Sequence, residues 1–317
     1  MQIKVGLDLG ASAIKVVFEH NGKLVKKMFL NRIGDDTVEV KDGYKVVTVT
    51  DAGKEITSYV GHEEGLPNIT AKKVNLKYLE EILLTVAYIV KKECNSGDRE
   101  VQLDLRALLP VDQYKESKEL FANKLKAINI KGVVENETII VNVIDAKIKA
   151  EGLTLLNSCN IADHVTANNL LLLDVGASTA DWMFLRKKDN GYMPVKGDSV
   201  GAAGTAIMQL ITTAVNKQNG GESTYTWGEL ERDMAYEWKG DVHSVYNYVD
   251  AGETVVKKML NAVSLIANLN QVTVVVTGRA GKLVADTKYF KANVPSYHLL
   301  NKDLSTFGNA EGAYKSE

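Results

Sequence analysis

Apolar and polar residues alternate in short blocks along the first part of the chain, and the first two blocks predict a β-hairpin. Residues 3–9 are apolar and β-prone, a Gly-Ala-Ser stretch interrupts them, and residues 14–19 resume the pattern. Small residues between two such runs are typical of a tight turn. Over residues 76–90, leucine, isoleucine and valine recur at helical spacing, which predicts an amphipathic helix.

The neighbouring segments predict further strands and helices. Residues 34–70 are polar and carry short Val/Thr alternation, so we expect a small β insertion there. After the amphipathic helix we expect a strand over 101–109, a helix over 113–127, a strand over 139–144 and a helix over 150–158.

The pattern then restarts near residue 170. Residues 170–175 form a continuous apolar run typical of a strand buried on both faces. A Gly-Ala-Ser-Thr turn follows, and then a strand over 180–185, a helix over 205–217, a polar insertion over 218–250, a helix over 251–268 and a strand over 272–277. Because the order of strand, turn, strand and insertion appears twice, we expect a duplicated α/β fold with a cleft between its halves.

The composition is that of a globular protein, and it also indicates the cellular compartment. The chain has 317 residues, of which 45% are hydrophobic and 25% charged, enough for two domains of ordinary size. Its two cysteines, Cys94 and Cys159, have no metal-ligand spacing, and no apolar run is long enough to cross a bilayer. We therefore expect a cytoplasmic protein without a membrane partner.

Charge is spread along the chain and not gathered in one segment. The formal net charge is -2, and basic residues occur in scattered pairs such as Lys72-Lys73 and Lys187-Lys188. Proteins that grip the DNA backbone usually concentrate positive charge on one face. We therefore expect no direct binding to nucleic acid, and we expect these lysine pairs to be solvated.

The first hairpin carries residues suited to phosphate. Asp8 ends the first strand, Gly10, Ala11 and Ser12 form the turn, and Lys15 follows in the second strand. Small side chains let backbone N–H groups approach a phosphate, and oriented amides form an anion-binding concavity. Lys15 adds a cation and Ser12 a hydroxyl. Asp8 can hold Mg²⁺ through water, because Mg²⁺ dehydrates reluctantly.

The second hairpin repeats this layout. Asp174 ends a strand, and Gly176, Ala177, Ser178 and Thr179 follow it. We expect Asp174 to hold Mg²⁺ through water as well. Each motif opens one half of the chain, and two such hairpins that face each other would clamp a polyphosphate and its Mg²⁺ between them.

A third loop follows the strand over 272–277. Gly278 and Ala280 are small enough to let a base and ribose lie close to the backbone at the start of a helix. Arg279 interrupts the small residues, and it either stacks on adenine or points to solvent. Together the three loops predict a nucleotide-binding site.

These motifs resemble the phosphate 1, phosphate 2 and adenosine motifs of the actin-like ATPase superfamily, which includes sugar kinases and heat-shock chaperones. The subfamily that the chain resembles most is that of the ParM/StbA plasmid-segregation actins. Three further stretches resemble this family: the Leu-Pro stretch of 107–114, the loop of 197–201, and the Asn-Ala-x-Gly of 307–312. The resemblance adds Gly201 to the nucleotide-binding residues and covers nearly the whole chain.

The resemblance implies a fold and a division of the chain. The fold would be α/β, with two duplicated actin-like (ribonuclease H-like) domains and a nucleotide cleft between them. Domain I would cover 1–160, with about 34–70 as the small subdomain IB. Domain II would cover 161–317, with about 218–250 as subdomain IIB. The C-terminal helix near 306–317 would return to domain I.

The resemblance also implies an activity. ATP and Mg²⁺ would fill the cleft, closure of the cleft would promote polymerisation into filaments, and hydrolysis to ADP would destabilise them. The partners would be copies of the chain and a DNA-binding adaptor on a centromere-like plasmid site, which agrees with the scattered basic residues. Two alternatives within the superfamily stay open: a small-molecule kinase, and a non-filamentous scaffold of the pilus or division type.

The chain departs from the family at one position. The family places a Glu, or in actin a Gln, at the start of the first connecting helix to orient the attacking water. The straightforward register puts Ala146 there, so we expect Asp145 to take this role, with Asp174 sharing it through its Mg²⁺ and water contacts. Asp145 can equally be an ordinary helix N-cap. Glu151 is the next candidate for orienting the water.

Overall fold

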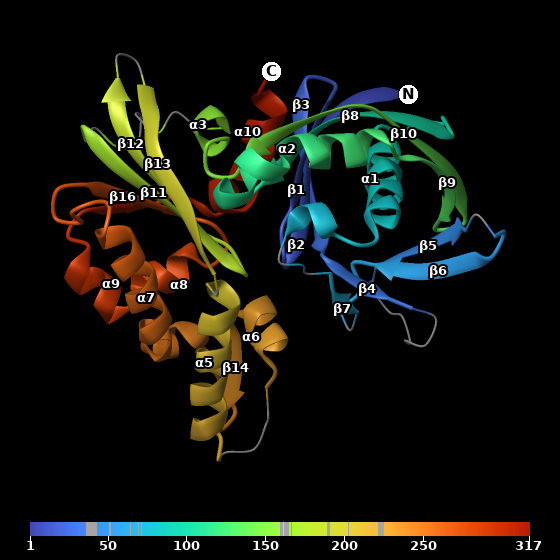
Figure 1. The fold of residues 1–317 in the computed structure, drawn as a ribbon. Coiled ribbons are helices and arrows are strands. Elements are labelled where there is room, and N and C mark those ends of the chain that lie inside the picture. Colours follow the sequence, from blue (N-terminus) through green and yellow to red (C-terminus); the bar gives the residue numbers. More distant parts are fainter. Residues whose placement is uncertain are drawn as a thin grey trace. The chain divides into compact units, whose positions relative to one another are not determined.

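A computed structural model gives the fold of the chain (Figure 1). It describes residues 1–35, 43–50, 52–63, 65–68, 70, 72–158, 161, 165, 167–188, 191–201, 203–220 and 225–317. The chain divides into two compact units: unit 1 consists of Met1–Cys159 and Phe307–Glu317, and unit 2 of Asn160–Thr306. Among the described residues, no helix combines the length and the apolar composition that crossing a lipid bilayer requires.

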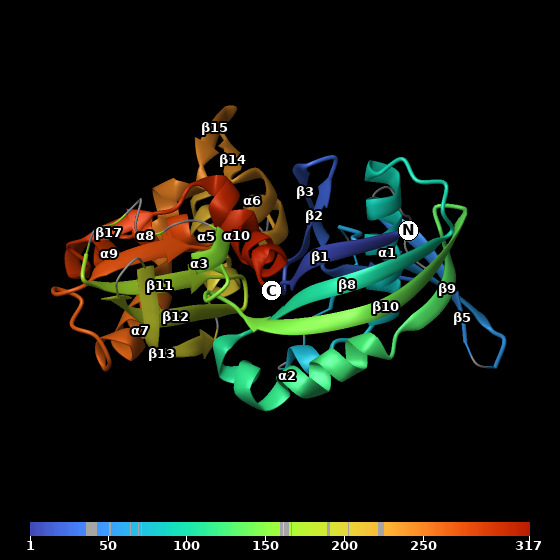
Figure 2. The same cartoon turned by 90° about the horizontal axis from the view of Figure 1, so that it is seen from above.

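Unit 1 is built on one large sheet. Its strands are β1 (Gln2–Leu9), β2 (Ala13–His20), β3 (Lys23–Leu30), β4 (Arg32–Gly34), β5 (Tyr44–Val49), β6 (Glu55–Val60), β7 (Leu66–Pro67), β8 (Glu100–Leu109), β9 (Asn129–Val134) and β10 (Glu137–Ala150). Within the described residues these ten strands have the order β3-β2-β1-β8-β10-β9-β5-β6-β4-β7. β1, β8 and β10 run parallel, and β2 and β3 continue the sheet as an antiparallel meander (Figure 2).

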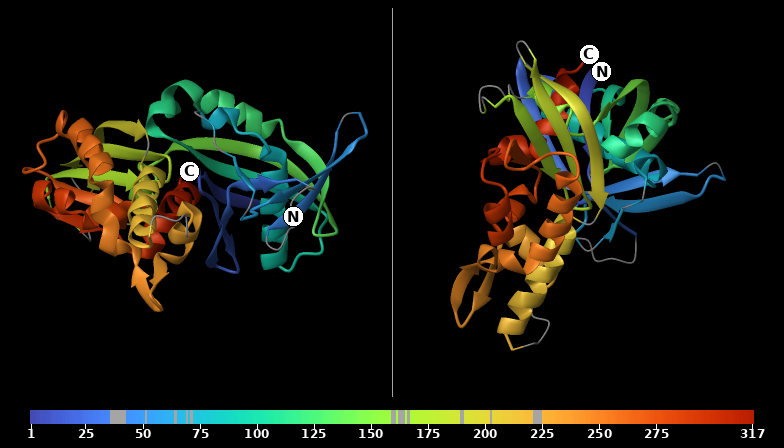
Figure 3. Two further views of the ribbon diagram at one scale, coloured as in Figure 1. Left: turned by 90° about the horizontal axis from the view of Figure 1, so that it is seen from below. Right: turned by 60° about the vertical axis from the view of Figure 1, so that its left-hand side comes forward.

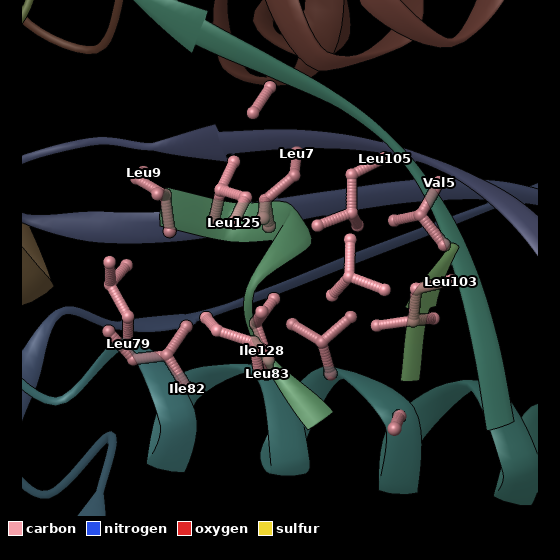
Figure 4. Close-up of a cluster of buried hydrophobic side chains, with 14 of the residues drawn as sticks. Val5, Leu7, Leu9, Leu79, Ile82, Leu83, Leu103, Leu105, Leu125 and Ile128 are labelled. Atoms are coloured by element: carbon pink, nitrogen blue, oxygen red, sulfur yellow. The ribbon is translucent and has the colours of Figure 1, made fainter. Parts of the chain in front are cut away.

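Helices pack on one face of this sheet and complete the core of unit 1. The single turn α3 (Leu155–Ser158) lies instead beside Gly308, near the C-terminus. The helices on this face are η1 (Lys73–Asn75), α1 (Leu79–Glu93) and α2 (Val111–Lys126). Alternate residues of β1, namely Val5, Leu7 and Leu9, are buried among them. Figure 4 shows these side chains together with Leu83 of α1 and Leu125 of α2. The predicted amphipathic helix and the hairpin before it are thus confirmed.

The opposite face of β1 contacts the C-terminal helix. This helix, α10 (Lys302–Lys315), supplies most of the C-terminal segment of unit 1. Lys4 Nζ donates a hydrogen bond to the carbonyl oxygen of Ser316 (3.0 Å). A Cβ atom at Gly6 would overlap the carbonyl oxygen of Ala310. α10 therefore lies against the backbone of β1 at a position that has no room for a side chain.

Unit 2 repeats the strand arrangement of unit 1. Its main sheet contains β11 (Asn169–Val175), β12 (Thr179–Lys188), β13 (Gly191–Gly201), β16 (Thr273–Thr277) and β17 (Tyr297–Leu299). Their order is β13-β12-β11-β16-β17, with the first two pairings antiparallel and the last two parallel. The segment β3-β2-β1-β8-β10 of unit 1 has the same order and the same orientations. The expected duplicated α/β fold is therefore confirmed.

Helices complete unit 2 around the face of its sheet that carries Leu173. They are α5 (Gly204–Gln218), α6 (Trp227–Asp233), η2 (Val245–Gly252), α7 (Glu253–Ser264), α8 (Gly281–Asp286) and α9 (Lys288–Asn293). Ile211 of α5 and Val256 of α7 pack in this core with Leu173 and Trp182. A separate hairpin, β14 (Ala235–Trp238) with β15 (Asp241–Ser244), lies with α5 and α6 at one end of the unit (Figure 3).

One predicted boundary was wrong, and a β-bulge explains the error. The strand expected over 139–144 and the first residue of the helix expected over 150–158 belong to one long strand, β10, and only α3 is helical. The register between β10 and β8 shifts between Val143 and Asp145. A bulge adds one residue to a strand, so the alternation resumes out of phase at Ala146. The polar-apolar alternation across this point was therefore hard to recognise as one strand.

Candidate functional site

The turn between β1 and β2 brings several predicted residues together. The register pairs Asp8 with Lys15, which leaves Gly10, Ala11 and Ser12 in the turn. Lys15 Nζ donates a hydrogen bond to Asp8 Oδ2 at 2.7 Å. The cation that was expected to meet phosphate is therefore held beside the turn by the carboxylate.

Asn31 holds the backbone of this turn with hydrogen bonds from both its side chain and its own backbone N–H. Its Nδ2 atom donates to the carbonyl oxygens of Gly10 (2.9 Å) and Asn68 (3.2 Å). Its own backbone N–H donates to the carbonyl oxygen of Ser12 (3.1 Å). Asn31 is fully covered by protein, so these bonds are protected from water. The turn is thus fixed by a residue that lies outside the motif.

Two ammonium groups surround the Asp8 carboxylate. Lys73 Nζ lies 3.6 Å from Asp8 Oδ1 and also forms an ion pair with Glu151. The side chains of Asp8, Lys15, Lys73 and Glu151 are between 7% and 14% exposed. Burial raises the pKa of the Asp8 carboxyl, but the charges and hydrogen bonds of the two lysines outweigh it and hold the pKa below its ordinary value of 3.8. Two positive and two negative side chains therefore balance at this turn.

Lys73 is a member of this group that the sequence did not indicate. We expected Lys72 and Lys73 to be solvated, which holds for the exposed Lys72 and is wrong for Lys73. Gln113 Oε1 accepts the backbone N–H of Lys73 at 2.9 Å. Lys124 Nζ donates to one carbonyl oxygen in η1 and to another just after it. These contacts fix η1 beside the end of β1. No sequence pattern near residue 73 predicts them.

The structure also separates the two carboxylates considered for orienting water. Glu151 directly follows β10, and its backbone N–H donates to the last carbonyl oxygen of β8 (2.8 Å). Asp145 lies inside β10 and is level with Asp104 and Lys4 in the sheet. Asp8 is four residues farther along β1, which corresponds to about 13 Å at 3.3 Å per residue. Glu151 is therefore part of the charge group at the turn, and Asp145 is not.

Asp145 belongs to a different charge group in the middle of the sheet. Its carboxylate forms ion pairs with Lys126 (3.1 Å) and Arg106 (3.7 Å). The hydrogen bond from Lys126 lowers the pKa of the Asp145 carboxyl, against a smaller opposing effect of burial. Neither of its two interpretations fits: no helix begins at Asp145 for it to cap, and its position is remote from the turn. We therefore transfer the water-orienting hypothesis to Glu151.

The second predicted hairpin has the same geometry as the first. β11 and β12 pair Asp174 with Asp181 at the position where β1 and β2 pair Asp8 with Lys15. In both hairpins the acid stands one residue before the end of its strand. The duplication therefore extends from strand order to individual register positions, but the partner across the hairpin is a cation in one case and an acid in the other.

The turn of the second hairpin contains the residues expected there. The backbone N–H of Gly176 donates to the carbonyl oxygen of Thr179 (2.9 Å), which closes the turn around Ala177 and Ser178. Thr179 pairs across β12 and β13 with Gly201. Residues 197–201, which were expected to form a loop, are instead the end of β13, and this end lies next to the turn.

Asp174 and Asp181 place two carboxylates on adjacent strands. They are 8% and 4% exposed, respectively. Thr179 Oγ1 donates to Asp181 Oδ2 (3.1 Å), and the Ser199 hydroxyl also donates to Asp181. Like charges directly opposite each other destabilise an antiparallel pair. A divalent cation near these two groups would relieve that repulsion.

Two further segments, the start of α5 and the loop after β16, form hydrogen bonds with the same turn. The backbone N–H of Gly204, the first residue of α5, donates to the carbonyl oxygen of Gly176 (3.0 Å). The backbone N–H of Ala280 donates to the last carbonyl oxygen of β11 (3.0 Å). Gly278 has φ +84°, and a Cβ atom there would lie 2.5 Å from Asp174 Oδ1. The predicted adenosine-type loop therefore packs directly on the predicted phosphate-type turn.

Arg279 has a partner within unit 2. Its Nη2 atom lies 3.8 Å from Glu231 Oε1, and its side chain is 26% exposed. The side chain therefore does not point freely to solvent, and stacking on adenine stays a prediction. Glu231 belongs to α6, so the ion pair ties this loop to the end of the unit that also carries α5.

Each turn, taken by itself, carries side chains suited to part of a magnesium nucleotide. In unit 1, Lys15 supplies an ammonium group, which binds phosphate oxygens by charge-assisted hydrogen bonds. Asp174 and Asp181 supply the carboxylate oxygens that Mg²⁺ prefers. Within the part of the chain that the structure describes, no group of three or more His, Cys, Asp and Glu side chains is arranged to hold a metal ion. Mg²⁺ usually keeps several waters and binds proteins through one or two carboxylates, which Asp174 and Asp181 would supply.

Comparison with known proteins identifies the fold. No protein-family model matches the chain, and no curated protein matches its sequence. A 15-stranded ParM filament from Clostridium botulinum matches with a TM-score of 0.75 and 16% identity over 99% of this chain and 98% of that chain. Ta0583, an archaeal actin homolog, matches with 0.74 and 15% over 98% of each chain. Bacillus thuringiensis ParM with ATP matches with 0.67 and 14% over 99% and 97%, respectively.

These matches extend over nearly the full length of each protein. The chain therefore has the fold of ParM-type actin-like proteins, as the sequence motifs had indicated. At identities of 14–16% the likeness describes the fold, and the chemistry rests on the side chains at the two turns.

Proposed function

We propose that the chain is an actin-like ATPase that assembles into filaments on binding ATP and serves plasmid DNA segregation, with hydrolysis to ADP destabilising the filament. The observation that carries the proposal is the repeated hairpin, in which Asp8 and Asp174 occupy the same register position before a small-residue turn. Three proteins with this fold add support: a ParM with ATP, an archaeal actin homolog with ADP, and a ParM filament.

The turn of unit 1 would bind the phosphates. Lys15 holds the Asp8 carboxylate in the structure, and a phosphate group offers the same kind of acceptor oxygen with more charge. On binding, the Lys15 ammonium group would turn from the carboxylate to the phosphate. The backbone N–H groups of Gly10, Ala11 and Ser12 would complete the cradle.

The turn of unit 2 would hold Mg²⁺ through water, with Asp174 and Asp181 as the nearest carboxylates. The bound ion would neutralise charge on the phosphates. Ala177, Ser178 and Thr179 would bind phosphate oxygens, and Gly278 with Ala280 would leave space for the nucleoside. Because Gly278 packs on Asp174, nucleoside contacts and the carboxylate would respond to each other.

Glu151 would orient the water that attacks the terminal phosphate. It is the carboxylate that the structure adds to the turn of unit 1, where it shares Lys73 with Asp8. A group that accepts a proton or positions a water must lie within hydrogen-bond reach of it. Asp145 lacks this placement, because it lies about 13 Å from the level of Asp8 along the strand direction.

Self-association and nucleotide turnover are tested together by light scattering and sedimentation of the purified protein. We expect polymer above a critical concentration with ATP, more lasting polymer with a slowly hydrolysed ATP analogue, and disassembly after ATP is consumed. ATP consumption that needs a sugar or acid, without polymer, would point instead to a kinase. Binding without turnover or polymer would point to a scaffold.

The roles of the two carboxylates are tested by a matched pair of variants in unit 1. Glu151→Ala should slow phosphate release by about 100-fold or more while ATP-induced assembly is kept, since only the water-orienting group is removed. Asp145→Ala should leave phosphate release within about twofold of the unmodified protein. If the Asp145 variant were slow and the Glu151 variant were not, the water-orienting role would return to Asp145.

Asp174→Ala should abolish Mg²⁺-dependent turnover and leave the fold intact, as judged by circular dichroism.

The link to DNA would be indirect. The net charge of -2 and the scattered lysines favour a DNA-binding adaptor on a centromere-like plasmid site over direct contact with DNA. The purified protein should therefore show no retardation of DNA in a gel at physiological salt. Retardation without an adaptor would contradict this part of the proposal.

A further inference from the structure

Lys73 connects two buried carboxylates that belong to different strands. Its Nζ atom lies 3.6 Å from Asp8 Oδ1, at the end of β1, and forms an ion pair with Glu151, just after β10. An ammonium group has three donors and no acceptor, so one lysine can hold two carboxylates at once. The contact joins three segments that are far apart in the sequence.

The position of Lys73 is itself fixed at several points. Gln113 binds its backbone N–H, and Lys124 binds carbonyl groups at the end of η1. The Lys73 side chain is 14% exposed. Charged groups are costly to bury unless they are paired, so this ammonium group and its partners stabilise one another's placement.

Glu151 is held at both its backbone and its side chain. Its N–H donates to the last residue of β8, and the next N–H, of Gly152, donates to Asn309 Oδ1 (3.0 Å). These bonds fix where the side chain starts, and Lys73 fixes where the carboxylate ends. A group that orients a water needs its carboxylate in one place, because small displacements lower the rate of a positioned reaction strongly.

We propose that Lys73 is a positioning residue for Glu151: it holds the carboxylate at the phosphate turn and acts on hydrolysis through it. This inference rests on the proposed ATPase function and adds to it a residue from outside the three motifs. Lys73 would keep its contact with Glu151 when phosphate draws the other ammonium group, that of Lys15, away from Asp8. Its contribution would then appear in the rate of turnover and not in the binding of nucleotide.

A double-mutant cycle tests this role with the full-length protein and ATP. Glu151→Ala should lower kcat by about 100-fold or more, and Lys73→Met by about 10- to 100-fold, each with KM within about threefold. The double variant should be no slower than Glu151→Ala alone, because a residue that acts through Glu151 has nothing left to position. If the two losses multiply, or if Lys73→Met raises KM for ATP strongly, Lys73 acts on the nucleotide directly and the inference is overturned.

Lys91 provides a matched control in the same unit. It forms an ion pair with Glu137 (2.7 Å), and its side chain is 11% exposed, close to the value for Lys73. Lys91→Met should therefore cost similar stability and leave kcat within about twofold. Equal losses of kcat in Lys91→Met and Lys73→Met would reduce Lys73 to a structural role and contradict the inference.

A conservative variant keeps the test decisive if Lys73→Met does not fold. Lys73→Arg retains the charge and offers several donors, so we expect it to keep at least about one third of the unmodified kcat. Lys73→Gln keeps a donor without the charge and should fall well below Lys73→Arg. Equal rates for these two variants would contradict the inference. An unmodified protein that binds ATP without turnover would instead remove the proposed ATPase function, and this inference with it.

Discussion

Replacement of Gly278 by alanine tests how the adenosine-type loop is held against Asp174. Gly278 has φ +84°, which costs an L residue about 1–2 kcal/mol. The new Cβ atom would lie 2.5 Å from Asp174 Oδ1 and closer still to the carbonyl oxygen of Val175. Overpacking of this kind costs about 1–3 kcal/mol. We therefore expect Gly278→Ala to lower the free energy of unfolding of unit 2 by about 2–5 kcal/mol.

Gly240 offers a control with the same backbone conformation. It lies between β14 and β15, also has φ +84°, and its added Cβ atom would meet no atom within 4 Å. Gly240→Ala should therefore show the conformational cost alone, about 1–2 kcal/mol. Both glycines belong to unit 2, so the difference between the two variants measures the contact with Asp174 and Val175.

Urea unfolding followed by tryptophan fluorescence measures both variants. All three tryptophans, Trp182, Trp227 and Trp238, lie in unit 2, so the signal reports this unit. Equal free energies of unfolding for Gly278→Ala and Gly240→Ala would refute the reasoning, because the loop would then move off the turn without cost. Displacement of Asp174 should also weaken Mg²⁺-dependent nucleotide binding in Gly278→Ala and not in Gly240→Ala.

Three further changes test charge and close packing. Asp181→Asn removes one of two facing carboxylates, so calorimetry should show a higher melting temperature without Mg²⁺ and less stabilisation by Mg²⁺; an unchanged response would contradict the pairing. The pKa of Asp8 is lowered in the folded state, so its ionised form stabilises above pH 3.8 and this contribution disappears at lower pH. The stability gap between the unmodified protein and Asp8→Asn should therefore be full at neutral pH and narrow below pH 3.8; a constant gap would contradict this. In Gly312→Ala the new Cβ atom would overlap the carbonyl oxygen of Thr154, which should lower the free energy of unfolding by about 1–3 kcal/mol. Amide hydrogen exchange in α10 should therefore accelerate. Unchanged exchange would show that α10 is not packed there.

Elements with a strong local pattern could be predicted from the sequence. The apolar run before Asp174 became β11, the helical spacing over 76–90 became α1, and the predicted strand over 272–277 became β16. In each case neighbouring residues along the chain decide the structure. The repeated acid and small-residue turn also located both hairpins, because a tight turn depends on residues adjacent in sequence.

Features that depend on distant contacts could not be predicted. The bulge before Asp145 changes the phase of β10, so its last residues looked like the start of a helix. Lys73 looked like one of several solvated lysines, since its partners Asp8 and Glu151 lie far from it in sequence. Asp181 follows its turn closely, and its pairing with Asp174 could have been inferred from the position of Lys15 in the first hairpin.

The place of α10 has a consequence for how the protein is made. The hydrogen bond from Lys4 to Ser316 joins residues that are 312 positions apart. At about 5–20 residues per second, a ribosome needs about 16–60 s to synthesise that length. During this time unit 2 is completed, while the side of β1 at Gly6 has no helix to cover it. β1 is thus shielded at Gly6 only after nearly all of the chain between these two segments has been synthesised.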